Sequence, residues 1–246
     1  MPYMLYAIIA SDGKQESFHS LSATRGIHNA SAVGVTHKGL VAVLEQVDNA
    51  RVVINTDNAI RYAGVIEELH QHDDLLPARY GTVMETKDAV IGMLKQHEKE
   101  FKESLRRVRN KEEFSLKVFW NYEKGIEEIR KKMEHNSPEV TTPPTKEKKS
   151  TAYLLEKIKA YHFENAVLEY AEQLCEEIRH ATEAFSPDSK FKKMPSRSLL
   201  IDAVFLQKKG LKDDFIRLVR LINDRHNDFR FLLTGPWPPY SFADFK

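Results

Sequence analysis

The residues of this sequence that most resemble a metal site are a polar cluster of two histidines and two aspartates, His70, His72, Asp73 and Asp74. Histidine nitrogens and carboxylate oxygens are common metal ligands. His70 and His72, however, are two positions apart, and side chains with that spacing on a helix point in different directions. A histidine near a helix C-terminus is also stabilised by the helix dipole without any ligand. We therefore interpret the cluster as a helix end and expect no bound metal.

Other catalytic and nucleotide-binding patterns are missing from the sequence. No Gly-x-Ser-x-Gly motif marks a nucleophilic serine, and the 10 glycines form neither a GxGxxG nor a GxxxxGK phosphate loop. The single cysteine, Cys175, follows Leu174 on the apolar face of a predicted helix, so we expect a buried and unreactive thiol. One cysteine also excludes an internal disulfide and a cysteine-cluster metal site. We expect no catalytic residues and no cofactor.

Arg79 is a candidate for binding a carboxylate. It lies between Ala78 and Tyr80 in a segment whose β-branched and aromatic residues predict a short strand. An arginine near the end of a sheet can hold a carboxylate through two parallel hydrogen bonds. The more ordinary role for the same side chain is a structural salt bridge at a domain junction.

The C-terminal segment from Thr234 to Phe242, with the sequence TGPWPPYSF, combines prolines with aromatic residues. Proline fixes φ and removes a backbone donor, so the segment should be extended and should not join a central strand. Chain ends fray unless contacts hold them, and Trp237, Tyr240 and Phe242 carry too much apolar area to remain in water. We expect this tail to dock, either on the protein's own body at the domain junction or in a groove of a partner.

The elements that would position these residues follow from hydrophobic periodicity. In the N-terminal part the pattern predicts a strand at 3–10, a long loop at 14–30, a hairpin of 31–35 and 40–47, a helix capped by Thr56 or Asp57, a strand at 75–83, and a helix from Thr86 to Val108. The apolar face of the first helix is expected to contain Ile60, Ala63, Ile66 and Leu69. We interpret residues 1–110 as a modified ferredoxin-like domain, with a loop where the first helix of that fold would lie.

Residues 111–233 are predicted to form a second α+β domain. The pattern predicts a strand at 114–120, a helix at 123–134, a solvated linker at 137–149, a long helix from Ser150 or Thr151 to about Phe185, a minor edge strand at 190–194, a central strand at 199–206, a helix after Asp213 and a strand at 229–233. The apolar stripe of the long helix is expected to contain Leu154, Ile158, Tyr161, Leu168, Ala171, Leu174, Ile178 and Ala181. Strand, helix, strand, strand, helix, strand is the ferredoxin-like βαββαβ order. The tail, 234–246, follows.

Composition limits the partners and the location of the chain. Its 246 residues suit one large domain or two small ones, and 37 basic residues balance 36 acidic ones, so no global field attracts nucleic acid. The predicted strands also lack the glycine-aromatic run of RNA-recognition domains. The sequence contains no apolar run of membrane-spanning length and no basic start followed by an apolar core. We expect a cytoplasmic protein with no membrane span and no nucleic-acid partner.

Two segments of the chain resemble a known family. Leu76 to Thr82, with the sequence LPARYGT, is similar to the LP(V/A)R(F/Y)GT segment of the gas vesicle protein L/F family, and Tyr80 keeps an aromatic ring where that family has phenylalanine. Thr234 to Phe242 is similar to the family's C-terminal TGPWPPYSF signature. The opening strand and the segment 199–206 also fall where such chains have them. The resemblance covers essentially the whole chain, whose length is typical of the shorter, F-type members.

The resemblance implies a non-enzymatic accessory protein of gas vesicle assembly. Such a protein is expected to bind the small, very hydrophobic shell subunit, to keep it from aggregating during nucleation, and to be a minor component of the gas vesicle. Other accessory proteins of the vesicle are further expected partners. A chaperone-like surface can cover apolar patches with an aromatic-lined groove or by adding a strand. The family motifs mark the expected partner-binding residues, Arg79, Tyr80, Trp237, Tyr240 and Phe242, although a purely structural clasp accounts for them equally well.

A different class of function is a small-molecule-binding protein or an enzyme that uses the cleft between the two domains. This alternative predicts a deep cavity lined by carboxylates or histidines with shifted pKa values. The assembly role predicts instead a concave apolar surface without converging polar groups.

Overall fold

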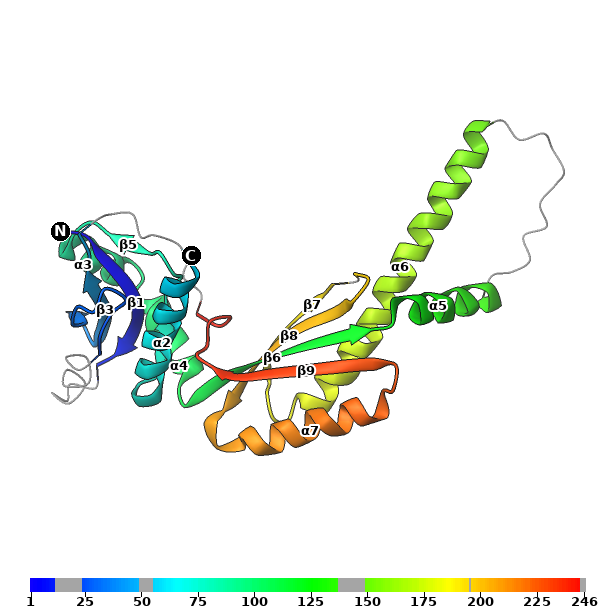
Figure 1. Ribbon diagram of the computed structural model, residues 1–246. Coiled ribbons are helices and arrows are strands. Elements are labelled where there is room, and N and C mark those ends of the chain that lie inside the picture. Colours follow the sequence, from blue (N-terminus) through cyan, green and yellow to red (C-terminus); the bar gives the residue numbers. More distant parts are fainter. Residues whose placement is uncertain (12–23, 49–54, 137–148, 195, 244–246) are drawn as a thin grey trace. The chain divides into compact units, whose positions relative to one another are not determined.

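The computed structural model describes residues 1–11, 24–48, 55–136, 149–194 and 196–243, and of residues 134–136 and 149–160 it describes the backbone alone (Figure 1). The protein is of the α+β class and has two antiparallel sheets. The chain divides into two compact units, which we call the N-terminal unit (Met1–Phe114, Leu206–Gly210 and Gly235–Lys246) and the C-terminal unit (Ser115–Phe205 and Leu211–Thr234). The expected domains, 1–110 and 111–233, stay a prediction.

The sheet of the N-terminal unit has five strands, β1 (Tyr3–Ala10), β2 (Val33–His37), β3 (Leu40–Gln46), β4 (Leu75–Pro77) and β5 (Val83–Met84). They follow the order β2-β3-β1-β4, and β5 also pairs with β1. All residues of β1 from Tyr3 to Ile9 are buried, as a nearly continuous apolar run predicts for a central strand. The predicted first strand is confirmed, and so is the presence of a hairpin, although its first strand lies at 33–37 rather than 31–35. The hairpin turns at Lys38 and Gly39, whose φ angles of 44° and 81° suit a tight turn.

A buried carboxylate holds the segment before β2 on this sheet. Glu45 of β3 is 0% exposed and accepts hydrogen bonds from the Tyr6 hydroxyl at 2.7 Å and from the His28 N–H at 3.0 Å. The Tyr6 hydroxyl accepts the Ile27 N–H at 2.8 Å. An added Cβ at Gly26 would lie 2.2 Å from Glu45 Cδ, so this close approach requires glycine. The charged group is thus paired inside the unit, as buried charges need to be.

Helix α2 (Thr56–His72) begins earlier than the sequence suggested. Its N-cap is Asn55, whose side-chain oxygen accepts the Asn58 N–H at 2.8 Å, rather than Thr56 or Asp57. The three-residue spacing of apolar residues predicted that Ile60 lies on the buried face of α2, but Ile60 is 66% exposed. A helix repeats every 3.6 residues, so a face chosen with a strict spacing of three drifts away from the buried side. That buried side contains Tyr62, Val65, Ile66 and Leu69.

The predicted helix from Thr86 to Val108 consists of two helices, α3 (Lys87–Gln96) and α4 (Glu98–Val108). Thr86 caps the first helix, as expected, by accepting the Ala89 N–H at 3.1 Å. The break is at His97, whose φ of −106° and ψ of 18° depart from helical values. The hydrogen bond from the Phe101 N–H to the His97 carbonyl, at 2.9 Å, continues past the break. The apolar periodicity continues across the break as well, so the pattern predicts a single helix.

The predicted strand at 75–83 is wrong in its middle, because β4 ends at Pro77, β5 begins at Val83, and a turn lies between them. Gly81 has a φ of 86°, which favours glycine. The Arg79 carbonyl accepts the Thr82 N–H at 3.1 Å and the Thr82 hydroxyl at 2.7 Å. Arg79 is therefore a turn residue and not a strand residue.

The remaining elements are β6 (Lys111–Trp120), α5 (Tyr122–Asn136), α6 (Lys149–Thr182), β7 (Asp188–Lys193), β8 (Leu199–Lys208), the 3-10 helix η1 (Lys209–Leu211), α7 (Lys212–Arg225) and β9 (Phe229–Trp237). Their four strands form a second sheet in the order β7-β8-β6-β9. The predicted alternation in β6 is confirmed by four buried residues, Phe114, Leu116, Val118 and Trp120. β9 continues past the expected end at 233 to Trp237. As the last strand in the order it is an edge strand, where proline is tolerated.

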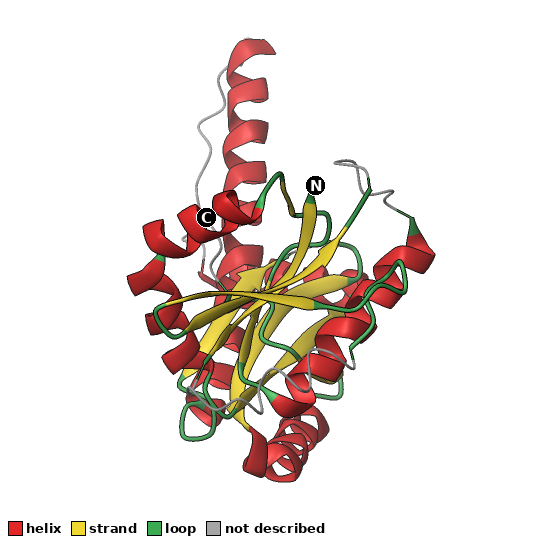
Figure 2. Ribbon diagram, turned by 90° about the vertical axis from the view of Figure 1, so that its left-hand side faces the viewer, coloured by secondary structure: helices red, strands yellow, loops and turns green. Residues whose placement is uncertain are grey.

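Helix α6 is longer than the sheet of its unit. A helix of 34 residues measures about 51 Å, whereas a strand of 10 residues spans about 33 Å. The N-terminal half of α6 therefore extends past the strands of its unit (Figure 1, Figure 2). Tyr161 and Leu168 are 64% and 38% exposed, contrary to the predicted stripe. Ala171, Leu174 and Ile178 are buried, as predicted.

Two further predictions concern this region. Cys175 is buried, as expected, and burial raises the pKa of its thiol to about 11. The predicted linker at 137–149 lies outside the described residues, apart from Lys149, with which α6 begins. The side chains of Leu154 and Ile158 lie outside them as well.

Candidate functional site

Residues 235–243, which we call the docked tail, pack on the N-terminal unit. Gly235 has a φ of 124°, and an added Cβ there would lie 2.8 Å from the Glu113 carbonyl oxygen. Both the conformation and the close approach require glycine. Pro238 and Pro239 are buried. The sequence thus folds this segment against the body of the protein through one glycine and two prolines.

Glu113 of β6 anchors the docked tail. Its Oε2 accepts the Ser241 N–H and its Oε1 accepts the Ser241 hydroxyl, each at 2.7 Å. Glu113 is 5% exposed, and hydrogen bonds to a charged acceptor shielded from water are the stronger kind. The two ends of this interaction are 128 residues apart in the sequence.

Phe242 gives the docked tail an apolar anchor. Its side chain is 1% exposed, and the Arg107 guanidinium lies 5.2 Å from the centre of its ring. The Phe242 N–H donates to the Pro239 carbonyl at 3.1 Å, which closes a turn. The ring of Phe242 therefore holds the tail in place from inside the unit.

A cluster of tyrosines lies where the tail meets α2. The rings of Tyr6 and Tyr62 are stacked with centroids 5.0 Å apart, and the ring of Tyr80 lies 5.0 Å from Tyr62 on a tilt. The Tyr62 hydroxyl donates to the Ala78 carbonyl at 2.9 Å. Burial raises the pKa of Tyr62 well above its ordinary value, and the nearby phenols of Tyr240 and Tyr80 raise it further. Tyr80 and Tyr240 are thus brought together around Tyr62.

The docked tail leaves two aromatic rings partly in solvent. Trp237 and Tyr240 are each 40% exposed. Burial of the rest of Tyr240, followed by the charges of Glu67 and Glu113, raises the pKa of its hydroxyl to about 12, so it is neutral at pH 7. Arg79 is exposed, and its guanidinium forms no ion pair within the described part of the chain. The arrangement presents neutral aromatic surface together with one available cation.

A cavity of about 450 Å³ lies elsewhere in the N-terminal unit, where the β2–β3 hairpin approaches the ends of α2 and α4. Its polar lining comes from the end of α2 and the residues after it, namely His72, Asp73 and Asp74. It also comes from Lys102 and Arg106 of α4 and from Arg109, which follows that helix. The volume suits a small ligand. The lining mixes carboxylates and cations, and it favours neither an anion nor a cation.

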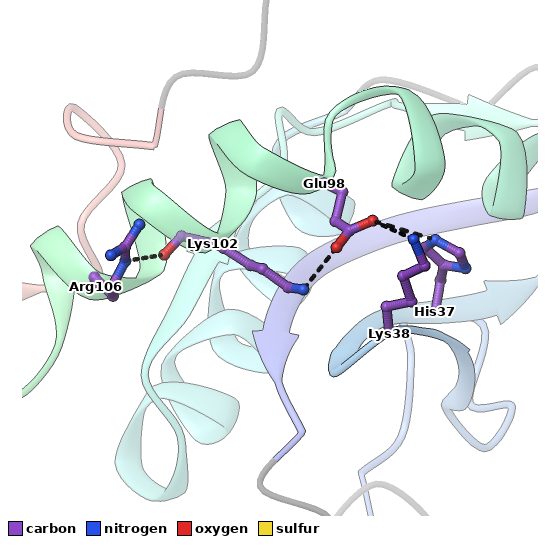
Figure 3. A network of polar contacts seen from close by, with 5 residues as sticks. All are labelled: His37, Lys38, Glu98, Lys102 and Arg106. Atoms are coloured by element: carbon purple, nitrogen blue, oxygen red, sulfur yellow. Dashed lines mark hydrogen bonds and ion pairs between the residues drawn. The ribbon is translucent and has the colours of Figure 1, made fainter.

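One of these cations is already paired, as Figure 3 shows. Glu98 accepts hydrogen bonds from Lys102 at 2.7 Å and from Lys38 at 3.2 Å, and His37 Nε2 lies 3.7 Å away. The two lysines hold the pKa of Glu98 at about 2. Arg106 donates its Nε–H to the Lys102 carbonyl at 3.3 Å. Such surface pairs contribute little to stability and mainly order the side chains.

His70 does not share this cavity with the other residues of the polar cluster. Both of its ring nitrogens are buried and have no hydrogen-bond partner among the described residues. Burial, and then the charge of Lys209, lower its pKa to about 4, so the ring is neutral at pH 7. In the part of the chain that the structure describes, no three His, Cys, Asp or Glu side chains are grouped to hold a metal ion. None of the helices described there is both long enough and apolar enough to cross a membrane.

The comparison with known families decides the family of the chain. The model described as "Gas vesicle synthesis protein GvpL/GvpF" matches residues 3–244. The chain belongs to the GvpL/GvpF family. No curated protein sequence matches it.

Two crystal structures share the fold of this GvpL/GvpF chain. Gas vesicle protein GvpF from Anabaena sp. PCC7120 aligns with a TM-score of 0.76 and 16% identity, over 100% of this chain and 97% of that chain. GvpF from Microcystis aeruginosa aligns with a TM-score of 0.77 and 16% identity, over 99% of each chain. At 16% identity, the similarity shows that the chains share a fold.

In this GvpL/GvpF chain the two motifs that carried the resemblance meet at Tyr62, because one supplies Tyr80 and the other Tyr240. Sequence reasoning missed Tyr62 and Glu113. The sequence does contain a signal for Glu113. Two adjacent acids, Glu112 and Glu113, lie at the start of a strand whose one face is otherwise apolar. Tyr62 carried no such signal, because its hydroxyl finds partners only once β1 and the turn after β4 are in place.

Proposed function

We propose that this chain is an accessory protein of gas vesicle assembly that binds the small hydrophobic shell subunit and keeps it from aggregating during nucleation. Family membership supports a role in gas vesicle synthesis. The partner, the chaperone-like action and the location in the cytoplasm and on the vesicle are our inferences. The observation that carries the proposal is the pair of partly exposed rings, Trp237 and Tyr240, on an anchored tail.

Anchoring makes these rings suited to bind an apolar partner. Tryptophan and tyrosine supply large contact areas and are enriched at the energetic centres of interfaces. The Ser241–Glu113 hydrogen bonds and the buried Phe242 fix the tail before any partner arrives. The tail then loses little conformational entropy on binding, and this raises the affinity. Arg79 and Tyr80 complete the proposed surface from the turn after β4.

We also infer that the chain is an F-type member and that its second sheet with its helices is ferredoxin-like. The likeness to two GvpF structures over nearly their full length supports the first inference. The second is supported by the sheet order β7-β8-β6-β9 and by the helices between β6 and β7 and between β8 and β9.

Co-purification with the shell subunit tests the proposed partner. We expect the wild-type chain to retain the subunit, and Trp237→Ala and Tyr240→Ala to retain at least about tenfold less, as for residues at the centre of an interface. Tyr161→Ala is the matched control, because it removes an exposed aromatic ring from α6. Circular dichroism checks that each variant is folded. If the wild-type chain retains no subunit, the proposal is wrong. If Trp237→Ala and Tyr240→Ala retain as much subunit as the wild-type chain, the tail is a structural clasp.

A further inference from the structure

The sheet formed by β7, β8, β6 and β9 has helices against one of its faces. Phe205 of β8 packs on Phe215 of α7 with ring centroids 5.3 Å apart, and Trp120 of β6 lies 6.2 Å from Tyr170 of α6. Side chains alternate between the two faces of a sheet along each strand. The neighbours of these residues in β6 and β8 therefore point away from α6 and α7. We call the side to which they point the open sheet face.

The centre of the open sheet face is apolar. Phe119 of β6 and Val204 of β8 are half-buried, and Leu232 of β9 is 46% exposed. Sheets ordinarily bury such a face against another layer of structure. Exposed apolar side chains that adjoin one another, rather than single ones, mark interaction surfaces.

The open sheet face is also basic. Lys117, Lys192 and Arg230 are exposed on it, and Asp202 of β8, which is half-buried, is an acid on the same face. The Arg230 guanidinium lies 4.8 Å from the centre of the Phe119 ring. This stacking leaves the guanidinium N–H groups at its edge available to an acceptor.

On the opposite side of the sheet, which the helices cover, two lysines form ion pairs. Lys193, the neighbour of Lys192 in β7, pairs with Glu172 of α6, and Lys124 of α5 pairs with Asp228. Within the described residues, Lys117 and Lys192 form no ion pair. The open sheet face therefore joins a partly exposed apolar centre to two lysines that form no ion pair within the described part of the chain.

We propose that the open sheet face binds an acidic amphipathic segment of a partner protein. The apolar side of that segment packs on the apolar centre, and its carboxylates pair with the three cations. A helix with one apolar and one acidic side fits best, because a helix supplies the missing layer over a sheet. This surface shares no residue with the docked tail, and the proposal does not depend on the identity of the shell-binding residues.

Two other occupants suit the face less well. Single-stranded nucleic acid would need free aromatic faces on which bases stack, and the ring of Phe119 is covered by Arg230. A second copy of the chain, joined by a two-fold axis, would place Lys117, Lys192 and Arg230 opposite the same cations. Repulsion between like charges opposes that pairing.

Peptide titration tests the proposal directly. Two synthetic amphipathic peptides of about five helical turns share a leucine side and carry glutamate or lysine on the other. We expect the full chain to bind the glutamate peptide at least about tenfold more tightly than the lysine peptide, and we expect its affinity to fall between about 0.05 M and about 0.5 M salt, because screening weakens exposed charge pairs. Isothermal titration calorimetry measures both affinities.

Charge-reversal variants locate the binding. Lys117→Glu and Arg230→Glu should each weaken binding of the glutamate peptide about tenfold or more. Arg220→Glu makes the same charge change at an exposed position of α7 and should leave the affinity within about twofold, since it lies on the helical side. Circular dichroism confirms the fold of each variant, and substitutions at exposed sites change stability little.

Several results would overturn the proposal. The open sheet face is not a basic binding site if the two peptides bind with equal affinity or if the glutamate peptide does not bind. The same conclusion follows if Arg220→Glu and Lys117→Glu lose equal affinity. Tighter binding of a single-stranded oligonucleotide, lost in the same variants, would make the face a nucleic-acid surface. Concentration-dependent self-association that Lys117→Glu abolishes would make it a contact between two copies. None of these experiments contains the shell subunit, so their failure is distinct from failure of the assembly role.

Discussion

At Glu113 a single carboxylate accepts both hydrogen bonds that Ser241 donates, from its N–H and from its hydroxyl. Glu113 is buried, so water does not compete for the carboxylate. Each hydrogen bond to a charged group contributes about 1.5–3 kcal/mol. Glu113 therefore fixes the position of the tail through hydrogen bonds, whereas the prolines restrict the conformation of its backbone.

Glu113→Ala should release the docked tail. With its acceptor removed, we expect the C-terminal residues to be cleaved by carboxypeptidase at least about tenfold faster, because loss of about 1.4 kcal/mol or more shifts the docking equilibrium by that factor. Mass spectrometry of the truncated products over time measures the rate. Glu103→Ala, an exposed acid of α4, serves as the control and should be cleaved like wild type. Unchanged cleavage of Glu113→Ala would mean that Phe242 alone holds the tail.

His70 should make stability depend on pH. Its pKa is about 4 in the folded protein, lowered mainly by burial, and close to 6.5 in the unfolded chain. Between these values the unfolded chain binds the proton more strongly, so the free energy of unfolding falls as the pH drops from about 6.5 to about 4. The loss from this residue is about 3 kcal/mol and is complete below about pH 4.

Urea denaturation of wild type and His70→Leu at pH 7 and pH 5 checks this expectation. The variant should lose less stability than wild type over this interval, because it has no imidazole to protonate. His162→Gln, an exposed histidine of α6, should keep the wild-type pH dependence. Equal losses in wild type and His70→Leu would show that other groups govern the acid sensitivity.

At the scale of elements, α6 divides into a packed half and an exposed half. Leu174 is 5% exposed and Leu168 is 38% exposed, although both belong to the stripe that periodicity selects. We expect Leu174→Ala to lower the free energy of unfolding by about 2–4 kcal/mol through loss of burial and creation of a cavity. Leu168→Ala should cost less than about 1 kcal/mol, since little is buried there.

Urea denaturation of the two α6 variants gives the difference directly, because each removes the same atoms from the same helix. Similar costs for both would mean that the N-terminal half of α6 is packed in solution. The comparison also separates the intrinsic helix propensity of alanine, which is the same at both sites, from tertiary packing.

The elements themselves were largely predictable, because most depend on local patterns. β1, the β2–β3 hairpin and the cap at Thr86 follow from an apolar run, a glycine-containing turn and a threonine before a periodic segment. The errors have tertiary causes. Periodicity shows that a helix has an apolar side, but the length of the neighbouring sheet decides which turns of α6 are covered. The turn at Arg79 and the break at His97 depend on how β1 and the following helices pack.

At the scale of the whole molecule, the family could be predicted from two motifs, and residues 3–244 match its model. The candidate site was predictable only in part. The motifs contain Tyr80 and Tyr240, whereas the residues that hold them, Tyr62 and Glu113, lie in segments without a family signature. Long-range contacts of this kind connect residues more than a hundred positions apart, and a single sequence does not record them.

We propose that the exposed rings of the docked tail cover the apolar shell subunit. Light scattering of the shell subunit, diluted from denaturant into buffer that contains the chain, tests this proposal. We expect equimolar wild-type chain to suppress the scattering. Trp237→Ala combined with Tyr240→Ala should suppress it at least about tenfold less efficiently, and Tyr161→Ala should act like wild type. Scattering that rises equally with and without the wild-type chain would show that the tail does not protect the subunit.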